Sequence, residues 1–149
     1  MEIDGRGTYE MIKAKNYYDK NLNPDGKGID NQFQLQPGDS VIFDAATGLT
    51  WQQSGSGIIS YSVADDEYIQ KTNAETYGGY NDWRLPTLEE GMSLMEPGKK
   101  NDLYISAQFD KGQIRIWTSD KPTASRAWYV IFINGNCFKV EFEDSIINV

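Results

Sequence analysis

Residues 128–142 contain two apolar runs separated by Asn134-Gly135, and this pattern constrains the fold more than any other part of the sequence. Asn-Gly between such runs is typical of a two-residue type I′ turn, so the segment is predicted to form a β-hairpin. Aromatic side chains occur on both faces of the hairpin, so we expect both faces to be partly covered. With a two-residue turn, the opposed pairs are Phe132 with Cys137, Val130 with Lys139, and Trp128 with Glu141.

The segment upstream of the hairpin alternates between strand and helix patterns. The best-marked helix begins at Thr87, where Thr87 and Glu90 have the spacing of a capping box, and it is expected to end at Pro97-Gly98. The other expected elements are strands at 41–43, 49–52 and 114–118, a turn at 44–48, and a helix over 62–76. These patterns predict two helices and several short strands in one domain.

Residues 1–37 are polar and rich in turn-forming residues, most densely over residues 20–28. We interpret residues 1–37 as an N-terminal arm or linker and residues 38–149 as the domain. Three tyrosines in the arm, Tyr9, Tyr17 and Tyr18, suggest that part of it packs on the core.

The net charge of −8 disfavours two classes of partner, because it repels phosphate backbones and anionic membrane surfaces. No apolar run is long enough to span a membrane, and the first residues lack the apolar stretch of a signal peptide. These features favour a cytoplasmic location without fixing the compartment.

The sequence contains no histidine and a single cysteine, Cys137. Nucleophile pairs that need an imidazole are therefore excluded, as are zinc sites built from His or from several Cys. Cys137 lies between apolar neighbours on a predicted strand, so we expect a buried, inert thiol. We expect no cofactor and no metal site, although a structural calcium ion is not excluded by these residue types.

Four segments together resemble the Lcl C-terminal domain family, over a stretch from about residue 38 to residue 149. They are DAATGLTWQ at 44–52, GYNDWRLPTLEE at 79–90, WTS at 117–119 and AWYVIF at 127–132. The resemblance implies an α+β, C-type-lectin-like fold with two helices packed on twisted antiparallel strands and a C-terminal hairpin. This fold is related to that of formylglycine-generating enzymes. It also implies a binding role, in a domain that sits C-terminal to bacterial kinase or peptidase modules. Some relatives with this fold are variable proteins of diversity-generating retroelements, which use their last hairpins as a mutable binding face.

Two positions depart from the pattern of the family. Family members end in a Val-Arg-x-Val-Arg strand, whereas this chain ends in residues 146–149, IINV. Gly91 interrupts the second predicted helix, where a better helix former is expected. The sugar-binding calcium loop of C-type lectins needs Glu-Pro-Asn or Gln-Pro-Asp, and Glu96-Pro97-Gly98 lacks the third ligand.

The final hairpin and the loop before it are the predicted ligand-binding site, because surfaces of aromatic, Asn and Ser residues bind diverse partners at low entropic cost. A structural role is preferred for the segment 81–84, NDWR: Trp83 and Leu85 as core anchors, and Arg84 paired with a carboxylate. The candidate site residues are Tyr129, Asn134, Asn136, Phe138, Lys139, Asp144, Ser119 and Asp120.

The sequence therefore predicts a non-catalytic module that binds a protein or glycan partner, and not nucleic acid. The alternative is an enzyme of the formylglycine-generating or glycosidase type, which would need a reactive thiol or a perturbed carboxylate in a pocket. A third interpretation is an oligomerising domain whose aromatic face packs against a second copy.

Overall fold

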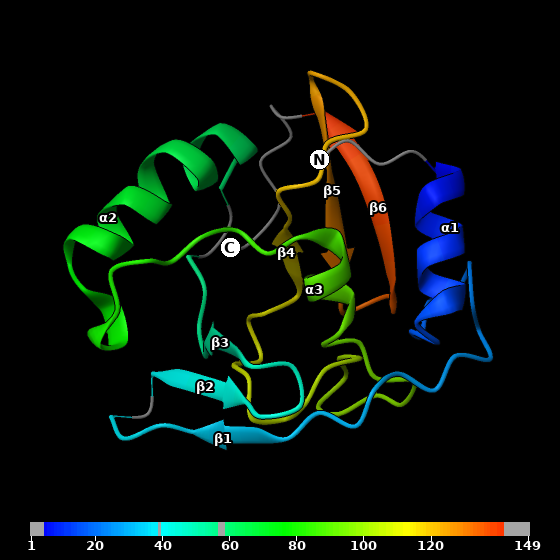
Figure 1. The fold of residues 1–149 in the computed structure, drawn as a ribbon, viewed down its shortest axis with the longest axis horizontal. Coiled ribbons are helices and arrows are strands. Elements are labelled where there is room, and N and C mark those ends of the chain that lie inside the picture. The colour runs from blue at the N-terminus through cyan, green and yellow to red at the C-terminus, as the bar shows by residue number, and fades with distance from the viewer. Residues whose placement is uncertain (1–4, 39, 57–58, 142–149) are drawn as a thin grey trace.

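The computed structural model describes residues 5–38, 40–56 and 59–141, and their arrangement is α+β, as predicted. Two three-stranded antiparallel sheets, ordered β1-β2-β3 and β4-β5-β6, are combined with a few short helices (Figure 1). The elements are α1 (Gly5–Ala14), β1 (Phe33–Leu35), β2 (Val41–Asp44), β3 (Leu49–Gln52), the π-helix η1 (Val63–Tyr68), α2 (Ile69–Ala74), the 3-10 helix η2 (Tyr77–Gly79), α3 (Leu88–Met92), β4 (Arg115–Trp117), β5 (Arg126–Ile131) and β6 (Asn136–Glu141).

The C-terminal hairpin lies where the sequence predicts it, but its turn and register differ. β5 and β6 pair from Arg126 opposite Glu141 to Ile131 opposite Asn136, which leaves residues 132–135 as a four-residue loop. A type I′ turn needs positive φ at both central residues, and of the two only Gly135 has it, at 80°. The predicted pairing is therefore wrong by two residues. A shift of two keeps every side chain on its predicted face.

Phe132 explains the longer loop, because its backbone is held by segments outside the hairpin. Its amide donates to the carbonyl oxygen of Ile114 at 2.7 Å, and its carbonyl oxygen accepts from the amide of Tyr104 at 2.8 Å. Its side chain is fully buried. These long-range contacts remove Phe132 from the β5–β6 ladder and override the local preference of Asn-Gly for a two-residue turn.

Strand β5 is covered on both faces, as predicted, because its alternate side chains enter two different hydrophobic clusters. Trp128 and Val130 pack in the larger cluster with Ile12 of α1 and Leu88 of α3. On the other face lies a smaller cluster, next to η1 and α2, and in Figure 1 α1 and α2 lie on opposite sides of the β4-β5-β6 sheet. The buried members of the smaller cluster are Tyr61, Ala64, Leu85, Trp117, Ala127, Tyr129 and Ile131.

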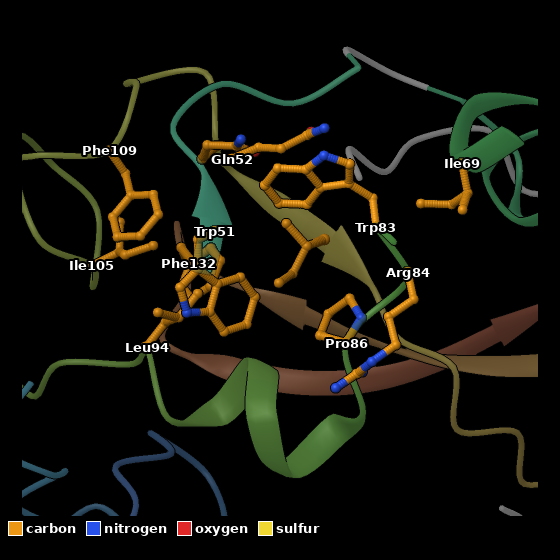
Figure 2. Close-up of a pocket in the computed structure, with 12 residues that line it drawn as sticks. Trp51, Gln52, Ile69, Trp83, Arg84, Pro86, Leu94, Ile105, Phe109 and Phe132 are labelled. Carbon is orange, nitrogen blue, oxygen red and sulfur yellow. The ribbon is translucent and has the colours of Figure 1, made fainter. Parts of the chain in front are cut away.

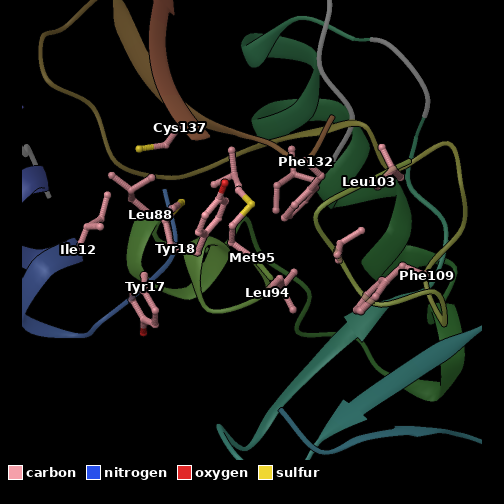
Figure 3. Packing of buried hydrophobic residues seen from close by; sticks show 14 of the residues in the cluster. Ile12, Tyr17, Tyr18, Leu88, Leu94, Met95, Leu103, Phe109, Phe132 and Cys137 are labelled. Carbon is pink, nitrogen blue, oxygen red and sulfur yellow. The ribbon is translucent and has the colours of Figure 1, made fainter. Parts of the chain in front are cut away.

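The N-terminal segment contributes to the larger cluster and includes a helix, α1, that the sequence did not predict. Tyr17 and Tyr18 are buried, whereas Tyr9 is 44% exposed. Asp19, which is completely buried, accepts hydrogen bonds from the amide of Cys137 at 3.1 Å and from its thiol at 3.4 Å. The segment thus contacts strand β6, and Figure 3 shows Tyr17, Tyr18 and Cys137 in the same cluster. The division at residue 37 stays a prediction.

The two helices predicted from the sequence are present, the second shorter than expected. The pattern over 62–76 corresponds to η1 followed directly by α2. At α3 the capping box is confirmed: the amide of Glu90 donates to Thr87 Oγ1 at 3.1 Å, and the amide of Thr87 donates to Glu90 Oε1 at 2.8 Å. However, α3 ends at Met92 and not at Pro97.

Gly91 allows α3 to lie close against β5. A Cβ atom at this position would lie 2.9 Å from Val130 Cγ2, a methyl group of a fully buried side chain. Valine is stiff at χ1 and cannot easily turn aside. Glycine has a low helix propensity, but at this position it allows close packing between helix and strand.

We predict that Gly91→Ala lowers the free energy of unfolding by about 1–3 kcal/mol, because the added methyl group overpacks the contact with Val130. Chemical denaturation measures the change. Gly98→Ala is the matched control, since a Cβ there meets nothing within 4 Å, and it should change stability by no more than about 0.5 kcal/mol. Stabilisation by Gly91→Ala, as helix propensity alone would give, contradicts the close-packing explanation.

Candidate functional site

The C-terminal hairpin presents two large apolar side chains to solvent. Phe138 of β6 is 56% exposed, and Ile133 of the hairpin loop is 39% exposed. The ring of Phe138 packs edge-on against Tyr129 of β5, with centroids 6.5 Å apart. On the opposite face of the hairpin, Lys139 Nζ lies 5.5 Å from the ring centroid of Trp128. The hairpin thus holds an exposed aromatic ring on a well-packed base.

Several predicted site residues lie in the interior. Tyr129 and Asn136 are 8% and 9% exposed, and Asp120 is 1% exposed. Asp120 links α3 to β5, because Oδ2 accepts from the amide of Leu88 at 2.6 Å and its backbone oxygen accepts from the amide of Trp128 at 2.9 Å. Ser119 is partly exposed and Asn134 is exposed, while Asp144 lies outside the described residues.

A pocket that the sequence did not reveal opens where the two sheets and α2 meet (Figure 2). Its cavity has a volume of about 70 Å³. Apolar and aromatic side chains dominate the lining, with Gln52, Arg84 and Gln113 as its polar members. The lining residues are Trp51, Gln52, Ile69, Trp83, Arg84, Pro86, Leu94, Ile105, Phe109, Gln113, Ile116 and Phe132.

Trp83 is held at the pocket by hydrogen bonds to its backbone and its indole. Asn73 of α2 binds the Trp83 backbone twice: Asn73 Oδ1 accepts from the Trp83 amide at 2.6 Å, and Asn73 Nδ2 donates to the carbonyl oxygen at 2.9 Å. Trp83 Nε1 donates to the carbonyl oxygen of Tyr77 at 2.9 Å. Trp83 was expected in the core, but it is only partly buried and forms a wall of the pocket. Leu85 is buried, as predicted.

Arg84, also at the pocket, is paired with a carboxylate, as predicted. Its two terminal nitrogens donate to Glu90 Oε1 and Oε2, each at 2.7 Å, and Nη1 also donates to the carbonyl oxygen of Leu85 at 3.1 Å. Hydrogen bonding from Arg84 lowers the pKa of Glu90 and outweighs burial, which acts in the opposite direction. The positive charge at the pocket is therefore already neutralised.

Two polar atoms of the lining are unsatisfied. Within the described part of the chain, Trp51 Nε1 and Gln113 Oε1 have no hydrogen-bond partner, although both atoms are buried. Gln113 as a residue is 4% exposed. By contrast, Gln52 Oε1 accepts from the hydroxyl of Tyr68 at 2.8 Å. Each of the two unpaired atoms thus belongs to a residue of the lining but is itself almost inaccessible to solvent.

Residues 40–146 match the Lcl C-terminal domain, which is most of the chain and includes every residue that lines the pocket. The chain belongs to the Lcl C-terminal domain family. No curated protein and no solved structure matches the sequence. The family assignment agrees with the resemblance carried by the motifs at 44–52 and 79–90, and these two motifs supply Trp51, Trp83 and Arg84 to the pocket.

The first motif of this Lcl C-terminal domain is organised by Asp44, which is completely buried. Burial opposes ionisation of Asp44, but its hydrogen bonds outweigh burial and lower its pKa. The donors are the amides of Gln32 (2.8 Å) and Ala46 (3.0 Å), Asn31 Nδ2 (2.7 Å) and Thr47 Oγ1 (3.1 Å). Asp44 thus fixes the turn that leads into β3, the strand that carries Trp51.

Neither a metal-binding cluster nor a membrane-spanning helix is found among the described residues. Among residues 5–38, 40–56 and 59–141, no three Cys, Asp or Glu side chains are arranged to hold a metal ion. In the same ranges, no helix is both long enough and apolar enough to cross a bilayer.

We predict that the Arg84–Glu90 pair stabilises this domain at neutral pH and less so in acid. The folded-state pKa of Glu90 is lowered, so its contribution is complete above the ordinary value of 4.5 and is lost as the pH falls through the folded pKa. Between about pH 5 and about pH 3, the unfolding free energy of Glu90→Gln should fall less steeply than that of the native chain. Denaturant titrations over this range measure it.

The matched control is Glu75→Gln, which breaks an exposed ion pair with Lys71 at 4.0 Å. Exposed pairs contribute little, so this variant should follow the native pH profile. Equal profiles for Glu90→Gln and the native chain contradict the assigned role of Arg84.

Proposed function

We propose that this domain is a non-catalytic ligand-binding module that holds a protein or glycan partner through its C-terminal hairpin. The observation that carries the proposal is Phe138, a large aromatic side chain 56% exposed on a strand whose partner, β5, is buried on both faces. Rigid exposed aromatic residues supply much of the contact energy in binding surfaces at low entropic cost.

Lys139 follows Phe138 on β6, but its side chain lies on the opposite face of the sheet, against Trp128. Its ammonium group lies over the ring of Trp128, so the hairpin carries an aromatic ring on one face and a cation on the other. Asn134 and Ile133, both exposed in the loop at the end of β5, extend the surface.

The proposal includes a C-type-lectin-like arrangement for the whole domain. Two small antiparallel sheets, helices beside the second sheet and a C-terminal hairpin are consistent with it. A variable protein of a diversity-generating retroelement is a special case of this proposal, in which the retroelement diversifies the hairpin residues. A near-copy of the 3′ coding end beside a reverse-transcriptase gene would support that case.

A binding test uses two hairpin residues and a distant control. Phe138→Ala combined with Lys139→Ala should weaken binding to the strongest ligands on an array of defined glycans and proteins by about tenfold or more, because it removes the ring and the cation. The array is run with and without calcium. Leu35→Ala, at a 43% exposed residue of β1, should leave binding unchanged.

Equal binding by the hairpin variant and the native domain contradicts this placement of the site, as does an absence of binding on the whole array. Light scattering on the same samples separates the proposal from the oligomerising alternative, which requires a dimer or larger assembly that the hairpin variant disrupts.

The enzyme alternative makes a different prediction for Cys137. Its thiol is buried beside Asp19. Burial is the main cause that raises the pKa of the thiol well above the ordinary value, and the negative charge of Asp19 raises it further. We therefore expect no reaction with a thiol reagent at pH 8 in the folded protein and full reaction in denaturant. Rapid labelling of the folded chain would support a reactive thiol, and with it an enzyme of the formylglycine-generating type.

A further inference from the structure

The pocket between the sheets has a buried floor and an accessible rim (Figure 2). The floor is formed by residues that are each no more than 7% exposed: Leu94, Ile105, Phe109, Gln113, Ile116 and Phe132. The rim is formed by residues that are not buried: Trp51, Gln52, Ile69, Trp83, Arg84 and Pro86. A hollow of this form can admit a group from outside, which a closed packing defect cannot.

The lining offers little to a charged or polar group. Among the described residues it contains no Asp or Glu, and its one cation, Arg84, donates to both oxygens of Glu90. The side-chain oxygen of Gln52 accepts from the hydroxyl of Tyr68, and the side-chain oxygen of Gln113 is almost inaccessible to solvent. An ionised group would lose its hydration here without gaining a partner. The group that enters the pocket is therefore uncharged and apolar.

The size of the cavity limits the group further. Its volume of about 70 Å³ is half that of an apolar cavity of roughly 150 Å³ that holds benzene. At the same volume for each carbon, the pocket has room for about three or four carbon atoms. The branched end of a leucine or isoleucine side chain is of this size, whereas an aromatic ring is too large.

The affinity that such a group can gain indicates where it comes from. Each buried methylene group strengthens binding by about fourfold, so a free hydrocarbon of about four carbons would bind only in the millimolar range. The group must therefore belong to a larger molecule that makes further contacts at the rim. Arg84 can make one, because its bonds to Glu90 and Leu85 leave further N–H donors of the guanidinium without a partner among the described residues.

We propose that the pocket binds a leucine or isoleucine side chain of a protein partner, whose backbone lies across the rim. The side chain packs on the apolar floor, between Trp51 and Trp83, and a backbone carbonyl oxygen of the partner accepts from Arg84. An apolar anchor in a pocket with a polar rim is the arrangement that dominates the energy of many protein interfaces.

This site is separate from the hairpin surface. No pocket residue belongs to β6 or is one of the predicted site residues of the hairpin. The proposal therefore holds or fails independently of the role proposed for Phe138.

Methyl signals in ¹H–¹³C spectra of the domain, labelled at the isoleucine δ1 carbon, provide the test. Ile105 and Ile116 on the floor report on the pocket, and each signal is assigned by its loss in the corresponding valine variant. Ile12, fully buried on α1, is the reference for an unaffected core, and Ile133, 39% exposed in the hairpin loop, is the reference for non-specific surface binding.

Capped amino acids are the first probes, because they differ only in the side chain. N-Acetyl-leucine N-methylamide should shift the Ile105 and Ile116 signals with a Kd in the millimolar range. The asparagine compound has the same branched shape but a polar end, and the alanine compound lacks the branched end. Each should bind about tenfold more weakly or worse, with the Ile12 and Ile133 signals little changed throughout.

A second pair of probes tests whether the source is a protein. The capped peptide Gly-Gly-Leu-Gly-Gly presents the isobutyl group on a backbone, and isobutanol presents the same group without one. The peptide should bind about fivefold or more tightly than isobutanol, because its backbone contacts the rim.

Paired aromatic variants test the position of the site. Trp83→Ala removes one wall and should weaken binding of the capped leucine by about fivefold or more. Tyr80→Ala is the control, since this ring packs on Trp83 but does not line the pocket, and it should change the Kd by less than about twofold. Ile69→Ala, at the partly exposed rim, is a second variant that should weaken binding if Trp83→Ala does not fold. Phe138→Ala should leave the shifts unchanged, which keeps this result distinct from a failure of the hairpin surface.

Three results would overturn the proposal. The first is an absence of shifts at Ile105 and Ile116 with the capped leucine and with the peptide. The second is equal binding of the leucine and asparagine compounds, which would mean that the pocket does not select an apolar group. The third is equal affinity for the peptide and isobutanol, which would mean that the pocket serves a free small molecule and not a protein partner.

Discussion

The structure depends on one constraint: strand β5 is apolar on both faces and must be covered on both. Trp128 and Val130 require one partner layer, while Tyr129 and Ile131 require another. The first layer is built from α1 and α3, and the second from η1 and α2. Because these segments are short, none has a core of its own, and each is stabilised mainly by its contact with this sheet.

The close approach of α3 to β5 shows how tightly this layer is fitted. Gly91 lies against Val130, and Asp120 binds the first amide of α3 while its backbone holds Trp128. Asp120 thus connects α3 through its carboxylate and β5 through its backbone oxygen. The sequence analysis assigned Asp120 to the binding surface, but the structure shows that Asp120 is buried and helps to position that surface.

The pocket arises where this framework meets the N-terminal sheet. Asp44 fixes the turn before β3, and Asn73 and Tyr77 fix Trp83. Trp51 and Trp83 are thereby positioned on separate rigid segments that do not close completely on one another. Two motifs that identify the family in sequence therefore meet in space around a cavity, which gives their shared occurrence a physical reason.

The family and several local structures could be predicted from the sequence because they rest on short-range patterns. The capping box at Thr87 and Glu90 needs only the geometry of one helical turn, and the two faces of β5 need only alternation. The pairing of Arg84 with a carboxylate was also predicted, and its partner, Glu90, lies only six residues away in the sequence. Helix α1 was not predicted, because residues 1–37 are mostly polar and rich in turn-forming residues. Its apolar face, which includes Ile12, is stabilised only by packing on the core.

Tertiary structure alone decided the hairpin register, the burial of Asp120 and Asn136, and the pocket. The Asn134-Gly135 sequence favours a two-residue turn, but Phe132 bonds to Ile114 and Tyr104, and these contacts outweigh the preference of the turn. Likewise, Trp51 and Gln113 line one cavity only because the two sheets pack as they do. The sequence by itself determined which faces are apolar; what each face would meet depended on long-range packing that no local pattern encodes.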